Sequence, residues 1–120
     1  MTKTKERIYD LEERTFKFAE NVRRFVSKIR QIARNREDSK QLLRSSGSVG
    51  ANYIEANEAL SKKDFIHRIK ISRKESKESR YWLKLLDLGS DKKLDNQRDS
   101  LIQEATELMK IFGAIIRKSN

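Results

Sequence analysis

Residues 43–60 read LRSSGSVGANYIEANEAL, and the two halves of this stretch conflict. The second half is typical of a helix, whereas the serines and glycines of the first half weaken an exposed helix, each glycine by about 1 kcal/mol relative to alanine. A phosphate-gripping loop would use such residues, but Gly47-Ser48-Val49-Gly50 matches neither a P-loop nor a G-x-S-x-G turn. The stretch therefore predicts a helix with a second helix pressed closely against it.

The helix that packs against it is predicted over residues 62–88, where Ser72, Ser76 and Ser79 recur at helical spacing. A tight hairpin would place small residues of the two helices opposite each other, with Gly50 opposite Ser72. Small side chains let two helix backbones approach more closely than leucine side chains do. This close contact would offset the cost of the helical glycines.

Apolar residues at helical spacing continue along the chain and predict four helices. The first helix begins at a capping pair, Asp10 and Glu13, and its apolar stripe runs without interruption to Ile32. Gly89 suits the left-handed position that ends the third helix. The predicted helices cover about residues 10–35, 39–60 (begun by Asp38 or Ser39), 62–88 and 93–118. Their short connections predict one domain over residues 1–120, an all-α antiparallel up-down-up-down four-helix bundle.

The chain contains no cysteine and no proline among its 120 residues. The lack of cysteine excludes disulfides and thiolate metal sites, and it fits a reducing compartment. The first residues lack the apolar core of a signal peptide, and no apolar run approaches the roughly 18 residues of a membrane span. We therefore expect a soluble, cytoplasmic protein.

The net charge is +10, and the excess is concentrated in two parts of the chain. Residues 1–37 hold 11 Lys and Arg against 6 Asp and Glu, and residues 61–90 hold 9 against 4. Such a surface favours a polyanionic partner, because binding releases counterions; the alternative is a surface that serves solubility alone. The candidate nucleic-acid contacts are Arg23, Arg24, Lys28, Arg30 and Arg34 on the first helix, and Arg68, Lys70, Arg73, Lys74, Lys77 and Arg80 on the third.

A polar stripe accompanies the small residues of the second and third helices. In the hairpin register Arg44 faces Glu78, and an unpaired carboxylate at such a boundary would be costly. The stripe therefore predicts a structural polar network that fixes the register, with a functional cleft as the alternative. Its members are Arg44, Ser48, Asn52, Glu55, Glu75 and Glu78, and His67 lies opposite Glu55 in the same register.

The run R-S-S-G-S-V-G-A-N-Y-I-E-A, followed by K-K-D-F-I-H-R-I-K-I-S-R-K-E-S-K-E-S-R-Y-W-L-K-L-L, resembles the four helix bundle protein family. That family includes the 23S rRNA intervening-sequence proteins. Its pattern R-(small)2-x-S-(apolar)-x-x-N-(apolar)-x-E-(small) is matched by Arg44, Ser48, Val49, Asn52, Glu55 and Ala56, although the family often has glycine at the last position. The resemblance implies a basic bundle that assembles into a homopentameric ring. Related accessory proteins of diversity-generating retroelements bind nucleic acid and a reverse transcriptase.

Two functions follow as hypotheses. The first is a non-enzymatic homo-oligomer that binds RNA or DNA through backbone phosphates, with weak selectivity and strong salt dependence. The second is a protein-interaction scaffold or accessory subunit with no direct nucleic-acid role. Phe16 lies off the main apolar stripe of the first helix and is a candidate for contact between subunits.

We do not expect enzymatic activity. A di-metal carboxylate bundle uses Glu-x-x-His pairs on two helices, whereas this chain has a single histidine, His67, and no such pair. A cysteine nucleophile is also lacking. The sequence therefore predicts no catalytic residue, no metal site and no cofactor.

Overall fold

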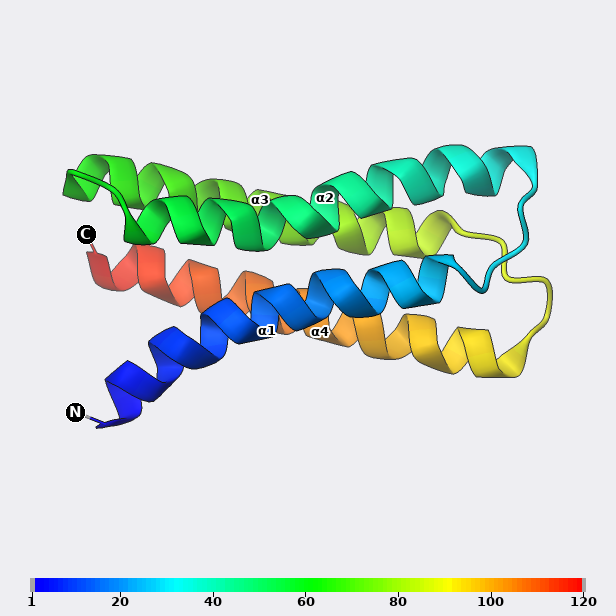
Figure 1. Ribbon diagram of the computed structural model, residues 1–120, viewed down its shortest axis with the longest axis horizontal. Helices are drawn as coiled ribbons and strands as arrows, with labels where there is room; N and C mark the ends of the chain where they lie inside the picture. The colour runs from blue at the N-terminus through cyan, green and yellow to red at the C-terminus, as the bar shows by residue number, and fades with distance from the viewer. Residues whose placement is uncertain (1, 120) are drawn as a thin grey trace.

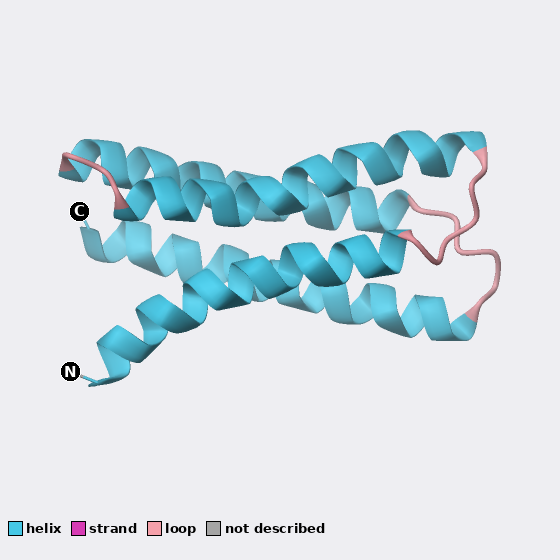
Figure 2. Ribbon diagram, in the orientation of Figure 1, coloured by secondary structure: helices cyan, strands magenta, loops and turns pink. Residues whose placement is uncertain are grey.

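The computed structural model describes the backbone of residues 2–119 and the side chains of residues 11–119. It contains four helices, α1 (Thr2–Val26), α2 (Ala33–Asn57), α3 (Lys62–Leu85) and α4 (Lys92–Ser119). Successive helices run antiparallel, as Figures 1 and 2 show, and contacts in the described chain link only neighbouring helices around the bundle. The predicted all-α up-down-up-down bundle is confirmed.

The core forms where the apolar stripes of the four helices meet. Phe18, Val22 and Phe25 of α1 are buried, as are Leu108 and Phe112 of α4. The α2–α3 contact is the most extensive and the α1–α4 contact the least extensive of the four. Burial of apolar surface at about 25 cal/mol per Å² is the main stabilising contribution to such a core. None of the helices, over residues 2–119, is long and apolar enough to cross a membrane.

Serines line the contact between α2 and α3, as the sequence predicts. The hydroxyl oxygens of Ser45 and Ser79 lie 2.9 Å apart, and both side chains are fully buried. Ser72 donates a hydrogen bond of 2.9 Å to the backbone carbonyl of Val49. A side chain on α3 therefore bonds directly to the backbone of α2, which requires the close approach that small residues allow.

The two glycines of α2 face α1 rather than α3, which corrects the prediction. A Cβ atom on Gly50 would lie 3.0 Å from Oγ1 and 3.2 Å from Cβ of Thr15, a buried α1 residue. A Cβ atom on Gly47 would meet only the end of the Arg23 side chain, at 3.5 Å. The serines and the glycines therefore serve different neighbours, because they lie on different faces of α2.

The predicted boundary between the first two helices is wrong at both ends. The first helix spans Thr2–Val26 and not 10–35, so Asp10 lies within it, and the side chain of Asp10 is outside the described residues. The second helix starts at Ala33 and not 39, with Ile32 as an N-cap that makes no side-chain bond. Ile29 lies in the loop between α1 and α2 but is still buried in the core. The apolar spacing of the sequence therefore continues past the end of α1 and does not mark that end.

Asn35 explains why the chain can turn there. Its side-chain amide donates to the backbone carbonyls of Arg30 (3.0 Å) and Asp87 (2.8 Å) and accepts from the backbone N–H of Asp87 (2.9 Å). Asn35 is fully buried. It thereby ties the α1–α2 loop to the α3–α4 loop at one end of the bundle, a pair of loops that Figure 1 shows side by side.

The other predicted ends are closer to the structure. Ser61 caps α3, accepting a 3.0 Å bond from the backbone N–H of Asp64. The third helix ends at Leu85 rather than 88, and Gly89 has the predicted left-handed φ of 64° in the following loop. Arg98 of α4 donates 2.7 Å to the carbonyl of Leu86, so an arginine and not the glycine satisfies this helix end. The fourth helix spans Lys92–Ser119 rather than 93–118, a difference of one residue at each end.

Candidate functional site

The basic residues predicted on the first helix are largely bound to the protein itself. Arg24 forms an ion pair of 3.7 Å with Glu20, and Arg30 and Arg34 both pair with Asp87. Arg30 lies in the α1–α2 loop and Arg34 in α2, so neither is part of α1. Because one carboxylate serves both arginines, the charge at this end is partly neutralised.

Asp87 is the centre of that cluster. Hydrogen bonds from Arg34 and from the backbone N–H of Gly89 hold the pKa of Asp87 below its ordinary value. The carboxylate therefore stays ionised under acidic conditions that would protonate an ordinary aspartate. Arg30 and Arg34 therefore help to hold the α1–α2 connection against the α3–α4 loop through Asp87.

The remaining candidates of α1 are Arg23 and Lys28. Arg23 donates 3.2 Å to the backbone carbonyl of Ala19 and extends over Gly47 of α2. Lys28 is exposed in the loop that follows α1. The structure therefore does not gather the five predicted cations of this group on one surface.

The basic residues of α3 are arranged differently. Lys70, Arg73, Lys74 and Lys77 are exposed and form no ion pair with any side chain of residues 11–119. They lie within two turns of one helix, so their charges act on the same region of solvent. This cluster is the strongest positively charged surface among the predicted contacts.

Two other predicted contacts are half-buried and bond to neighbouring helices. Arg68 donates 3.2 Å to the side-chain carbonyl of Asn52 on α2, and Arg80 donates 3.2 Å to the hydroxyl of Thr106 on α4. Both partners are neutral, so no negative charge offsets the charge of these arginines. The hydrogen bonds hold their guanidinium groups in position.

The structure brings together most of the polar stripe. Nη2 of Arg44 lies 3.3 Å from Oε1 of Glu78 and 3.5 Å from Oε1 of Glu75. Glu75 is buried, and that oxygen has no hydrogen-bond partner, so the ion pair alone offsets the loss of solvation. Asn52 donates to the carbonyl (2.9 Å) and the hydroxyl (3.0 Å) of Ser48. Glu55 and His67 are exposed and lie outside these bonds.

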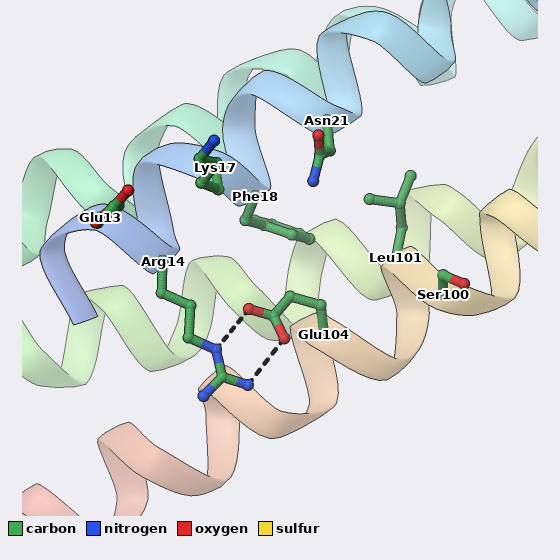
Figure 3. Close-up of a pocket in the computed structure, with 8 residues that line it drawn as sticks. All are labelled: Glu13, Arg14, Lys17, Phe18, Asn21, Ser100, Leu101 and Glu104. Atoms are coloured by element: carbon green, nitrogen blue, oxygen red, sulfur yellow. Dashed lines mark hydrogen bonds and ion pairs between the residues drawn. The ribbon is translucent and has the colours of Figure 1, made fainter. Parts of the chain in front are cut away.

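One polar cluster was missed from the sequence. Arg14 of α1 donates to Glu104 (2.7 and 2.9 Å) and to Glu107 (2.7 Å) of α4, as Figure 3 shows for Glu104. The hydrogen bonds that Arg14 donates to Glu104 raise the pKa of Arg14, and those that Gln103 and then Arg14 donate to Glu107 lower the pKa of Glu107. No local signal reveals this pairing, because its partners lie 90 residues or more apart in sequence.

A hollow of about 550 Å³ opens beside this cluster between α1 and α4 (Figure 3). Its lining includes Lys17, Asn21 and Ser100, but the guanidinium of Arg14 is already engaged by carboxylates. No group of three or more His, Cys, Asp or Glu within the described residues could hold a metal ion.

A second hollow, between α1 and α2, is mainly apolar. It is lined by Phe16 and Ile54, whose side chains are 65 % and 48 % exposed, and by the glycines and alanines between them. Glu12 and Glu13 form one end of it. We call this surface the α1–α2 groove.

Comparison with known proteins agrees with the fold. A family model described as 23S rRNA-intervening sequence protein matches residues 8–114. The chain is also similar to a crystal structure from Bacteroides thetaiotaomicron, described as a protein of unknown function from the S23 ribosomal protein family. The two share 33 % identity over 88 % of this chain and 97 % of that chain, with a TM-score of 0.73. No curated protein sequence matches this chain.

Proposed function

The chain belongs to the 23S rRNA-intervening sequence protein family, and on that premise we propose that it is a non-enzymatic, homo-oligomeric protein that binds nucleic acid. Binding would occur through backbone phosphates, with weak selectivity between RNA and DNA sequences. The observation that carries this proposal is the exposed basic cluster of Lys70, Arg73, Lys74 and Lys77 on α3.

The cluster is basic because the nearby carboxylates of α3 point elsewhere. Glu75 and Glu78 pair with Arg44 on the α2 side of the helix, so they leave the cluster without a counter-charge on α3. Clustered cations that lack internal partners raise the local concentration of polyanions. Phosphate contacts of this kind position a nucleic acid but do not read its bases, which accounts for the weak selectivity.

A titration of labelled 20-nucleotide RNA and DNA tests this proposal. The variant Lys70→Glu/Lys74→Glu/Lys77→Glu should lose binding at 50 mM KCl, whereas Lys40→Glu/Lys92→Glu/Lys93→Glu, with the same charge change at exposed lysines elsewhere, should lose much less. Absence of wild-type binding to either probe at low salt would refute the proposed function.

A homo-oligomeric ring is supported by the α1–α2 groove. Phe16 and Ile54 expose large apolar side chains on its two sides, which is unusual for a surface that stays in water. A second copy of this basic chain suits the groove, because Glu12 and Glu13 make one end of it acidic. Five copies is the number that the family resemblance implies.

Light scattering measures the oligomer directly. The variant Phe16→Ser/Ile54→Ser should have a lower mass than the wild type, while Tyr81→Ser, which removes an equally exposed aromatic side chain on α3, should not. Equal masses for all three proteins would remove the groove as the contact surface.

The protein-interaction scaffold remains the second candidate function, and the same groove favours it. A partner that stays attached to the tagged protein after nuclease treatment of the host lysate, and that is lost with Phe16→Ser, would favour the scaffold. Loss of all partners on nuclease treatment would favour nucleic-acid binding.

A further inference from the structure

The contact between α3 and α4 carries a row of basic side chains. Arg73, Lys77 and Arg80 are spaced four and three residues apart and so share one face of α3. The hydrogen bond from Arg80 to Thr106 shows that this face lies beside α4. We call this row, together with the α4 residues it faces, the α3–α4 seam.

Two arginines converge in this seam above a glycine. A Cβ atom on Gly113 of α4 would lie 3.5 Å from Nη1 of Arg117 and 3.9 Å from Nη1 of Arg73. Gly113 is buried, whereas Arg73 and Arg117 are exposed. One guanidinium group from each helix therefore lies close to the same point beside Gly113.

Four glutamates of the two helices are committed to other contacts. Glu104 and Glu107 of α4 bond to Arg14 on the α1 side of the bundle. Those of α3, Glu75 and Glu78, pair with Arg44 on the α2 side. Within residues 11–119, neither Arg73 nor Arg117 has a hydrogen bond or an ion pair to another side chain.

Convergence of two like charges without a counter-ion is electrostatically unfavourable. The negative C-terminal end of the α4 dipole favours a cation at Arg117, but that explains only one of the two groups. A phosphate that accepts one charge-assisted hydrogen bond of about 2.8 Å from each guanidinium would satisfy both. Arginine suits this role better than lysine, because its planar group donates several hydrogen bonds in fixed directions.

We propose that Arg73 and Arg117 grip one phosphate of a nucleic-acid backbone above Gly113, and that this point anchors the strand along the α3–α4 seam. The proposal rests on the proposed nucleic-acid function and adds to it a defined site that includes α4. Lys77 and Arg80 continue the seam from that point, so neighbouring phosphates of the strand would meet further cations.

The test compares two variants that lose the same charge. Arg73→Gln/Arg117→Gln removes the paired guanidinium groups, and Lys40→Gln/Lys93→Gln, which loses the same charge at exposed lysines away from the seam, is the matched control. Fluorescence anisotropy with a labelled 20-nucleotide RNA should show at least tenfold weaker binding for the first variant at 100 mM KCl, because both charge-assisted hydrogen bonds to the phosphate are lost. The plot of the logarithm of the binding constant against the logarithm of the salt concentration has a negative slope. For this variant the slope should be shallower by about 0.7, the value for one phosphate on a single strand.

A third variant separates this site from the effect of net charge. Gly113→Leu keeps every charge but places a bulky side chain at the point where the two guanidinium groups converge, so it should weaken binding as strongly as Arg73→Gln/Arg117→Gln. Circular dichroism confirms that each variant keeps its helices. Equal losses for the Lys40→Gln/Lys93→Gln control and the seam variant, or full binding by Gly113→Leu, would overturn the site while leaving nucleic-acid binding intact. No RNA or DNA binding by the wild type would refute the function itself, and with it the site.

Discussion

The hydroxyl oxygens of Ser45 and Ser79 lie 2.9 Å apart at the buried contact between α2 and α3. Ser79 donates its single proton to the carbonyl of Glu75 in its own helix (2.9 Å), so its oxygen accepts the proton of Ser45. The carbonyl of Leu42, the other acceptor near Ser45, is farther away at 3.3 Å. The distance between the two helices is therefore set by the smallest side chains that can still hydrogen-bond across it.

Enlarging Ser79 should destabilise the fold. Ser79→Leu adds buried volume where none is available and should lower the free energy of unfolding by about 1–3 kcal/mol, as overpacking does elsewhere. Lys74→Leu, the same new side chain at an exposed site of α3, should change it by about 0.5 kcal/mol at most. Urea denaturation measures both, and equal effects would show that the α2–α3 contact has spare room.

The two glycines of α2 should respond oppositely to alanine. Gly47→Ala should stabilise the protein by up to about 1 kcal/mol, because the new methyl group meets only the flexible end of Arg23. Gly50→Ala should destabilise it, since the methyl group would lie 3.0 Å from Oγ1 of buried Thr15. Thermal unfolding of the two variants in parallel checks this; a gain in stability for both would contradict the close α1–α2 approach.

Asn35 should be among the most sensitive polar residues. Asn35→Ala removes three hydrogen bonds, two of them to the part-buried backbone of Asp87, each worth about 0.5–1.5 kcal/mol. Asn96→Ala, at an exposed position of α4, is the control and should be close to neutral. A chemical denaturation midpoint unchanged by Asn35→Ala would show that the two loops are not held together by this side chain.

Stability should fall in acid through Asp87. Its pKa is lower in the folded protein than the ordinary value of about 3.9, so its contribution is fully present above pH 4 to 5 and is lost as the pH falls through the folded-state pKa. Asp87→Asn should be less stable than the wild type at pH 7, and the difference should shrink towards pH 2. Urea midpoints across this range measure it, and a constant difference would exclude ionisation as the cause.

Local signals in the sequence were sufficient for some elements. Ser61 and Asp64 indicate the start of α3, because a capping serine and the residue whose N–H it accepts are three residues apart. The pairing of Arg44 with Glu78 could be predicted because both helices of a tight hairpin share one register. The serine contact follows from the same register.

Other features depend on contacts that leave no local trace. Ile29 continues the apolar spacing of α1 although it lies in a loop, and neither glycine nor proline marks the turn. The turn is stabilised instead by the bonds between Asn35 and Asp87, 52 residues away. The basic residues predicted on the first helix do not form one surface for a related reason. Arg30 and Arg34 pair with Asp87, a carboxylate that is distant in the sequence. The position of Arg117 beside Arg73 is likewise set only by the packing of α3 on α4.

The position of the two termini at one end of the bundle has a mechanical consequence. The start of α1 and the end of α4 lie at the same end, next to the α2–α3 turn, and these two helices make the least extensive contact (Figure 1). A force that pulls the two termini apart would therefore unzip α1 from α4 progressively instead of shearing them. The hydrogen bonds by which Asn35 ties the two loops lie at the far end, so they would break only after α1 and α4 have separated and would protect the α2–α3 contact until then.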